Sequence, residues 1–156
     1  MLELQNQSVI HEIKQVLTDA REKVARTVNN ELLFAYWNIG RIIVESEQAG
    51  SEKAEYGKQL LKSLSKELTR ELGKGFSVSN LQYMRRFYLD YENQQTLSVK
   101  LSWSHYCDLL NISDQHARSF YQQESINSNW SVRELKRQFE DGEPQTRKYW
   151  SNEHVC

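Results

Sequence analysis

A long series of apolar residues with helical spacing dominates the first third of the chain. The series starts at residue 13, recurs every three or four residues and ends at residue 42. Its members are Ile13, Leu17, Ala20, Val24, Val28, Leu32, Ala35, Ile39 and Ile42. Their mean spacing is about 3.6 residues, which is the period of a straight α-helix. The pattern therefore predicts one amphipathic helix over residues 8–48.

This predicted helix would be about 60 Å long, which is more than one small domain can cover. Two interpretations stay open: the first half projects and packs on another chain, or the helix breaks near the weak helix formers Thr27, Asn29 and Asn30. A second apolar flank, which widens the stripe, consists of Ile10, Leu33, Tyr36 and Ile43. Gly40 costs a helix about 1 kcal/mol relative to alanine, so we expect another backbone to pack closely against it.

Residues 52–91 have the pattern of a helix-turn-helix-like pair. The first helix is predicted over 52–72, and its core face consists of Leu60, Leu61, Leu64, Leu68 and Leu72. Gly73 and Gly75 can end it through a left-handed cap. Ser77 can then cap the second helix. Its predicted buried face consists of Leu81, Met84, Tyr88 and Tyr91.

The remaining segments complete an all-α fold. Residues 92–100 are polar and predict a loop or short hairpin, and further helices are predicted over 101–139. The expected N-caps of these helices are Ser102 or Ser104, then Ser113, then Ser131, which forms a capping box with Glu134. We thus expect a long N-terminal amphipathic helix and a helix-turn-helix-like bundle within one domain, residues 1–139. A polar tail, 140–156, follows it.

Composition narrows the class of protein. Only one of the 156 residues is proline, which leaves the chain almost free of helix breakers. The longest apolar run, LLFAYW at 32–37, is far shorter than the roughly 18 residues of a membrane span, and the first residues lack a secretory signal pattern. Two cysteines, Cys107 and Cys156, provide no disulfide framework. We expect a cytoplasmic protein with no membrane association.

Candidate catalytic and metal-binding residues do not form a convincing site. His105, Cys107 and Asp108 are close in sequence, but their spacing does not place three ligands on one helical face. Asp114 followed by Glu134-Leu135-Lys136 matches the D…ExK signature of metal-dependent nucleases in form only, since the second part lies in a segment with helical spacing. We therefore expect no catalytic residues, no metal and no cofactor.

The charge distribution is more informative than the net charge of −1. Residues 53–91 carry eight positive and four negative side chains, whereas both flanking regions are net negative. Four cations recur every fourth residue on the side of the first helix of the pair away from its leucines: Lys58, Lys62, Lys66 and Arg70. Such like-charged neighbours repel one another by a few tenths of a kcal/mol. They indicate either a solvated lysine face or a surface for a polyanion.

The second helix of the pair has polar residues where a recognition helix would read DNA. In a helix-turn-helix this helix enters the major groove and presents its N-terminal residues to base edges. Helical geometry leaves Ser79, Gln82, Tyr83 and Arg86 outward, and it places Arg85 on a flank. Glutamine and arginine suit adenine and guanine edges, while serine and tyrosine suit phosphates. These residues, together with the lysine stripe and Lys74 in the turn, predict a site for double-stranded DNA.

Four blocks of the chain, taken in order, resemble the N-terminal domain of the YhcG-type family of bacterial proteins. The blocks are NNELLFAYWNIGRII at 29–43, GFSVSNLQYMRRFY at 75–88, LSWSHYCDLL at 101–110 and NWSVRELKRQF at 129–139. The resemblance implies a helical DNA-binding domain that precedes a nuclease domain of the PD-(D/E)xK class. Only 17 residues follow Phe139, so we expect this chain to lack the nuclease core and its catalytic carboxylates.

Two functions from different classes stay open. The first is a DNA-binding module, which is either a truncated relative of the family, a regulator, or the targeting half of a split nuclease whose nuclease subunit is encoded separately. The second is a module for protein–protein interaction that forms a homo-oligomer through its N-terminal helix and has no nucleic-acid role. The dependence of binding on salt separates them, because phosphate contacts weaken steeply with salt and an apolar interface does not.

Overall fold

A computed structural model describes residues 1–50 and 54–141 of the chain, and these residues form helices without any strand. The helices are α1 (Leu2–Gly50), α2 (Ala54–Leu72), α3 (Val78–Asp90), α4 (Trp103–Leu110), α5 (Gln115–Asn127) and α6 (Val132–Asp141). A short 3₁₀ helix, η1 (Gln94–Thr96), lies in the segment predicted as a loop or hairpin. The all-α prediction is confirmed. Within the described residues no helix is both long and apolar enough to span a bilayer.

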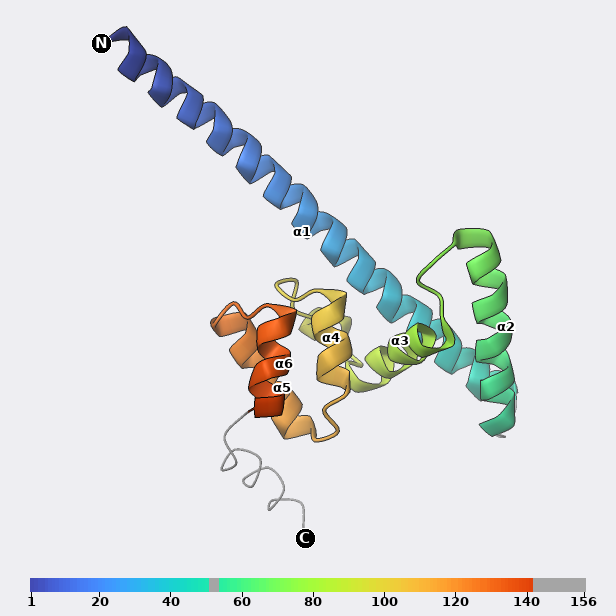
Figure 1. Cartoon of the computed structure of the whole chain (residues 1–156). Coiled ribbons are helices and arrows are strands. Elements are labelled where there is room, and N and C mark those ends of the chain that lie inside the picture. The colour runs from blue at the N-terminus through green and yellow to red at the C-terminus, as the bar shows by residue number, and fades with distance from the viewer. Residues whose placement is uncertain (51–53, 142–156) are drawn as a thin grey trace.

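Helix α1 is continuous over 49 residues and does not break at Thr27–Asn30. Figure 1 shows it as a straight rod whose first half extends well beyond the other helices. Residues 1–28 are all exposed, and burial begins at Asn29. The first half of α1 therefore projects from the bundle, and the interpretation that the helix breaks near Thr27–Asn30 is wrong.

The part of α1 that packs on the bundle uses a different face from the predicted stripe. Leu33 is 1% exposed and Ile43 is 2% exposed, both from the flank regarded as secondary. Leu32 and Ile42, from the main series, remain 46% and 53% exposed. At 3.6 residues per turn the two sets lie about 100° apart around the helix. The prediction of which face enters the core was therefore wrong, and α1 has two apolar faces.

Close contact between α1 and α3 organises the core. A Cβ on Gly40 would overlap the carbonyl oxygen of Met84 and would lie 2.8 Å from its carbonyl carbon, which confirms the expected close packing at this glycine. One cluster beside this crossing joins α1, α2 and α3 through Ile43, Leu61, Leu81 and Met84. A larger cluster joins α1 and α3 to α4, α5 and α6, with Phe87 and Tyr106 at its centre.

Most of the predicted N-caps are present in the structure. The Ser77 hydroxyl accepts from Asn80 N, and Ser102 and His105 form a reciprocal capping box at α4. The Ser131 hydroxyl accepts from Glu134 N at α6, which is one half of the predicted capping box, while the Glu134 carboxylate accepts from Arg137 and Gln138. Ser113 was the wrong choice for α5, because the carboxylate of Asp114 caps that helix by accepting two backbone N–H groups. A carboxylate accepts both groups at once and also interacts favourably with the helix dipole.

Candidate nucleic-acid interface

The turn between α2 and α3 sets the direction in which α3 leaves the pair. Gly73 and Gly75 have φ values of 89° and 108°, a conformation that L side chains rarely adopt. Asn80 fixes the turn from the other side: its amide donates to the carbonyl of Gly75 at 2.5 Å, and its carbonyl accepts from the indole of Trp103 at 3.0 Å. The start of α3 is thus tied to both the turn and α4.

The outward face of α3 is hollowed where the sequence places its candidate DNA-reading residues. Ser79, Gln82, Tyr83 and Arg86 together line a surface hollow of about 180 Å³. Leu81, Met84 and Phe87, on the opposite side of the helix, are 0% exposed. The structure therefore brings these four predicted residues together on one face.

Arg86 is held within this hollow by neutral groups. Its guanidinium donates to the backbone carbonyl of Leu110 at the end of α4, and it lies 5.8 Å from the ring centroid of Tyr83. The Tyr83 hydroxyl donates to the side chain of Asn111 at 2.9 Å. A carbonyl is neutral, and no carboxylate among the described residues pairs with Arg86. The hollow therefore presents a positive charge with free N–H donors beside hydroxyl and amide groups.

Arg85 has a different environment. Its Nε donates to both carboxylate oxygens of Glu47, at 2.9 and 3.0 Å, and the Glu47 side chain is only 17% exposed. This ion pair connects α3 to the end of α1. The geometry gives Arg85 a part in holding the two helices together, whereas its contact with DNA stays a prediction.

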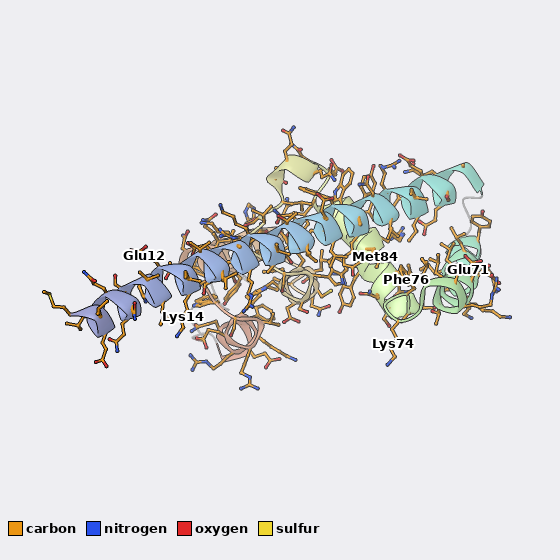
Figure 2. The ribbon with its side chains drawn as sticks, turned by 90° about the horizontal axis from the view of Figure 1, so that it is seen from above. Glu12, Lys14, Glu71, Lys74, Phe76 and Met84 are labelled. Carbon is orange, nitrogen blue, oxygen red and sulfur yellow. The ribbon has the colours of Figure 1, made fainter. Side chains whose placement is uncertain are left out.

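The cation stripe of α2 lies on the solvent side of that helix, as the spacing predicts. Lys58, Lys62 and Lys66 are exposed, and the described residues include no ion-pair partner for any of them. Arg70 differs, because it pairs with Glu67 at 2.6 Å and with Glu71 at 3.3 Å. Lys74 lies in the turn, where its side chain points away from the bundle (Figure 2). Among the side chains that the structure describes, no carboxylate pairs with three of the four stripe cations.

The residues considered above as catalytic or metal-binding candidates mostly have structural roles. The His105 ring contacts Ser102 through Nδ1 and the carbonyl of Trp130 through Nε2. Burial raises the pKa of Cys107 to about 12, so its thiol stays protonated. Asp114 caps α5, and Glu134 pairs with Arg137 on the helix α6. No cluster of potential metal ligands occurs among the residues that the structure describes.

One basic surface escaped the sequence analysis. A second hollow, of about 490 Å³, lies on α6 and is lined by Val132, Arg133, Lys136, Arg137 and Glu140. The sequence feature that could have indicated it is the three cations within RELKR, whereas this segment was interpreted only as the capped start of a helix. Leu110 and Asn111 hydrogen-bond to Arg86 and Tyr83 in the α3 hollow, but nothing in the sequence indicated these partners. Contacts between distant parts of the fold produce no regular spacing of residues in the sequence.

Comparison with known proteins places the chain in a family. Residues 12–143 match the model of the DUF1016 N-terminal domain. The chain belongs to this family. It is 38% identical over 162 residues to a protein of Escherichia coli (strain K12) described as "Putative nuclease YhcG", with 83% of this chain covered. The match spans 43% of the length of that relative. No solved structure matches the chain. The resemblance to the YhcG-type N-terminal domain is thereby confirmed.

Proposed function

We propose that this chain is a double-stranded DNA-binding module that targets or regulates nuclease activity and has no catalytic centre of its own. The observation that carries the proposal is the hollow on α3, where Arg86 lies among Ser79, Gln82 and Tyr83 and donates to a neutral backbone carbonyl. In this function, cleavage is supplied by a nuclease on another polypeptide or in another part of a longer protein. The relative described as a nuclease, which is more than twice as long as the matched region, supports that division of roles.

The chemistry of the α3 hollow fits a nucleic acid better than a small molecule. A guanidinium with free donors can bind a guanine edge or a phosphate in the plane of its fork, and a glutamine amide can bind adenine. The hollow is open to solvent and has no buried apolar lining of the kind that small-molecule pockets use. An exposed helix face with such side chains can present them to base edges in the major groove of a duplex.

The α2 stripe supplies the electrostatic component. Each lysine that neutralises a phosphate releases counterions and contributes about −0.9 to the slope of log affinity against log salt. Lys58, Lys62, Lys66 and Arg70 together therefore predict a slope of roughly −3 to −4. The exposed ion pairs of Arg70 do not prevent this, because such pairs contribute little free energy and exchange readily.

Fluorescence anisotropy with labelled duplexes at several salt concentrations tests the proposal. Replacing Lys62 and Lys66 by alanine should flatten the salt slope by about 2 and weaken all sequences alike. The matched control neutralises Lys14 and Lys23, two exposed lysines on the projecting half of α1, and should leave the slope unchanged. A folded wild type that shows no salt-dependent binding to any duplex at low ionic strength contradicts the proposal.

Base reading by α3 is tested with variants that spare the fold. Arg86→Lys keeps a positive charge and a donor for the Leu110 carbonyl but lacks the planar fork. Gln82→Ala removes an exposed amide. Each should narrow the gap between preferred and random duplexes by about 1–3 kcal/mol without changing the salt slope. Equal losses of affinity for all DNA sequences would show that α3 contacts only the DNA backbone.

The alternative function rests on the exposed apolar face of α1. An interaction module with no nucleic-acid role would bind its partner through that face, and the affinity would be nearly independent of salt. The same anisotropy measurements separate the two functions, because only DNA binding produces the steep slope.

A further inference from the structure

The projecting half of α1 has an apolar stripe that nothing in the described structure covers. It runs along one side of the helix and is made of Leu2, Val9, Ile10, Ile13, Val16, Leu17, Ala20, Val24 and Val28. We refer to residues 2–28 as the arm. Ile13 is 56% exposed, Leu17 52% and Val24 64%. Exposed apolar surface of this length on a soluble helix marks an interaction site or an aggregation hazard.

The stripe becomes discontinuous where the bundle begins. Glu31 occupies the position that would continue the centre of the stripe, and it is exposed. From Leu33 onward a different side of the helix enters the core. The continuous part of the apolar surface therefore lies on the arm, and beyond it only separate members of the series, among them Leu32 and Ile42, stay exposed beside the bundle.

Charges on the arm are divided between its two ends. Residues 2–13 contain two acidic side chains, Glu3 and Glu12, and no lysine or arginine. Residues 14–28 contain Lys14, Arg21, Lys23 and Arg26 against Asp19 and Glu22. Figure 2 shows Glu12 and Lys14 leaving the helix on opposite sides, so both edges of the arm carry charge. The first part is thus net negative by two charges and the second net positive by two.

We propose that the arm pairs with the arm of a second copy of this chain in antiparallel orientation. This orientation places the acidic end of each arm beside the basic end of the other, whereas a parallel pair would place like charges together. It also puts the two bundles at opposite ends of the pair. The proposal goes beyond DNA binding and does not depend on it.

The expected strength follows from the size of the overlap. Twenty-seven residues of helix are about 40 Å long, and a helix with its side chains is 10–12 Å wide. The footprint is then roughly 400–500 Å² per chain, which is at the low end for specific interfaces. The pair should therefore form reversibly, with a dissociation constant on the order of micromolar rather than as a permanent dimer.

Analytical ultracentrifugation of the full chain without DNA, over about 1 to 200 μM, tests the pairing. The wild type should shift from monomer to dimer over this range. Leu17→Glu introduces a charge into the stripe and should weaken the dimer at least tenfold. The control Thr18→Glu makes the same replacement on the other side of the arm and should leave association unchanged.

Charge reversal determines the orientation. Glu3→Lys with Glu12→Lys makes both ends positive and should weaken an antiparallel dimer about tenfold. Adding Arg21→Glu and Lys23→Glu restores complementarity and should restore the dimer. A parallel dimer would not respond to the first pair of substitutions in this way, because its like ends repel one another both before and after.

Three outcomes would overturn the proposal. They are a chain that stays monomeric at the highest concentration, a dimer that Leu17→Glu does not affect, and a dimer unchanged by the acidic-end reversal. A monomer that binds anionic vesicles would assign the stripe to a membrane surface instead. DNA binding by a strictly monomeric chain would leave the proposed function intact while refuting the arm pairing.

Discussion

Replacement of Gly40 by alanine is the sharpest test of how the long helix is seated on the bundle. The new Cβ would overlap the Met84 carbonyl oxygen, and it would lie 2.8 Å from the Met84 carbonyl carbon and 3.1 Å from the Tyr88 Cβ. Carbon atoms in favourable contact are about 3.5–4.0 Å apart. Because the nearest atoms belong to the α3 backbone, no side chain can rotate away. Helices α1 and α3 would have to separate by about 1 Å.

The cost can be estimated from this geometry. Overpacking a well-packed core costs about 1–3 kcal/mol, and a clash between two backbones falls at the upper end. Alanine is favoured over glycine within a helix by about 1 kcal/mol, which offsets part of that cost. We therefore expect Gly40→Ala to lower the free energy of unfolding by about 2 kcal/mol. For a domain of this size the melting temperature should fall by about 4–8 °C.

Gly57→Ala provides a matched control on α2. The Cβ added there would meet only the Glu47 carboxylate, at 3.5 Å, which is an ordinary contact. This variant should gain about 0.5–1 kcal/mol from helix propensity. Thermal and urea unfolding followed by circular dichroism would measure both variants. If Gly40→Ala is as stable as Gly57→Ala, the close crossing of α1 and α3 is not present in solution.

Three further predictions concern titration, thiol reactivity and catalysis. Burial raises the pKa of Tyr106 to about 12 and also raises that of Tyr91, so unfolded tyrosines ionise first. Urea unfolding at a series of pH values would measure the free energy of unfolding. The contribution of these tyrosines to it should be fully present below about pH 10 and should fall between pH 10 and 12 by up to about 1.4 kcal/mol per pH unit for each group. In a Cys156→Ser background, Cys107 should react with a thiol reagent at pH 8 far more slowly than the unfolded chain does, because its raised pKa leaves little thiolate, and labelling at the unfolded rate would contradict this. Purified chain with Mg²⁺ or Mn²⁺ should leave plasmid DNA intact, whereas cleavage that Glu134→Gln abolishes would reveal a metal site on α6.

The sequence determined the helical content and most helix ends, because both depend on local chemistry. Spacing of about 3.6 residues between apolar positions favours a helix, because it places those residues on one face that can be buried. A cap such as Ser77 depends only on residues within one turn. Gly40 indicated a close backbone contact, because glycine destabilises the interior of a helix relative to alanine and close packing against another backbone compensates for this cost.

Tertiary structure decided which apolar face of α1 is buried. Both faces have helical spacing, so periodicity could not rank them, and the longer series from Ile13 to Ile42 proved to be the exposed one. The choice depends on complementarity with α3, where Gly40 permits close approach on only one side of the helix. The same limit applies to Arg85 and Arg86. These two residues are adjacent in sequence but differ in environment. Arg85 pairs with the carboxylate of Glu47, 38 residues away, and Arg86 donates to the carbonyl of Leu110, 24 residues away, and only folding brings these partners near.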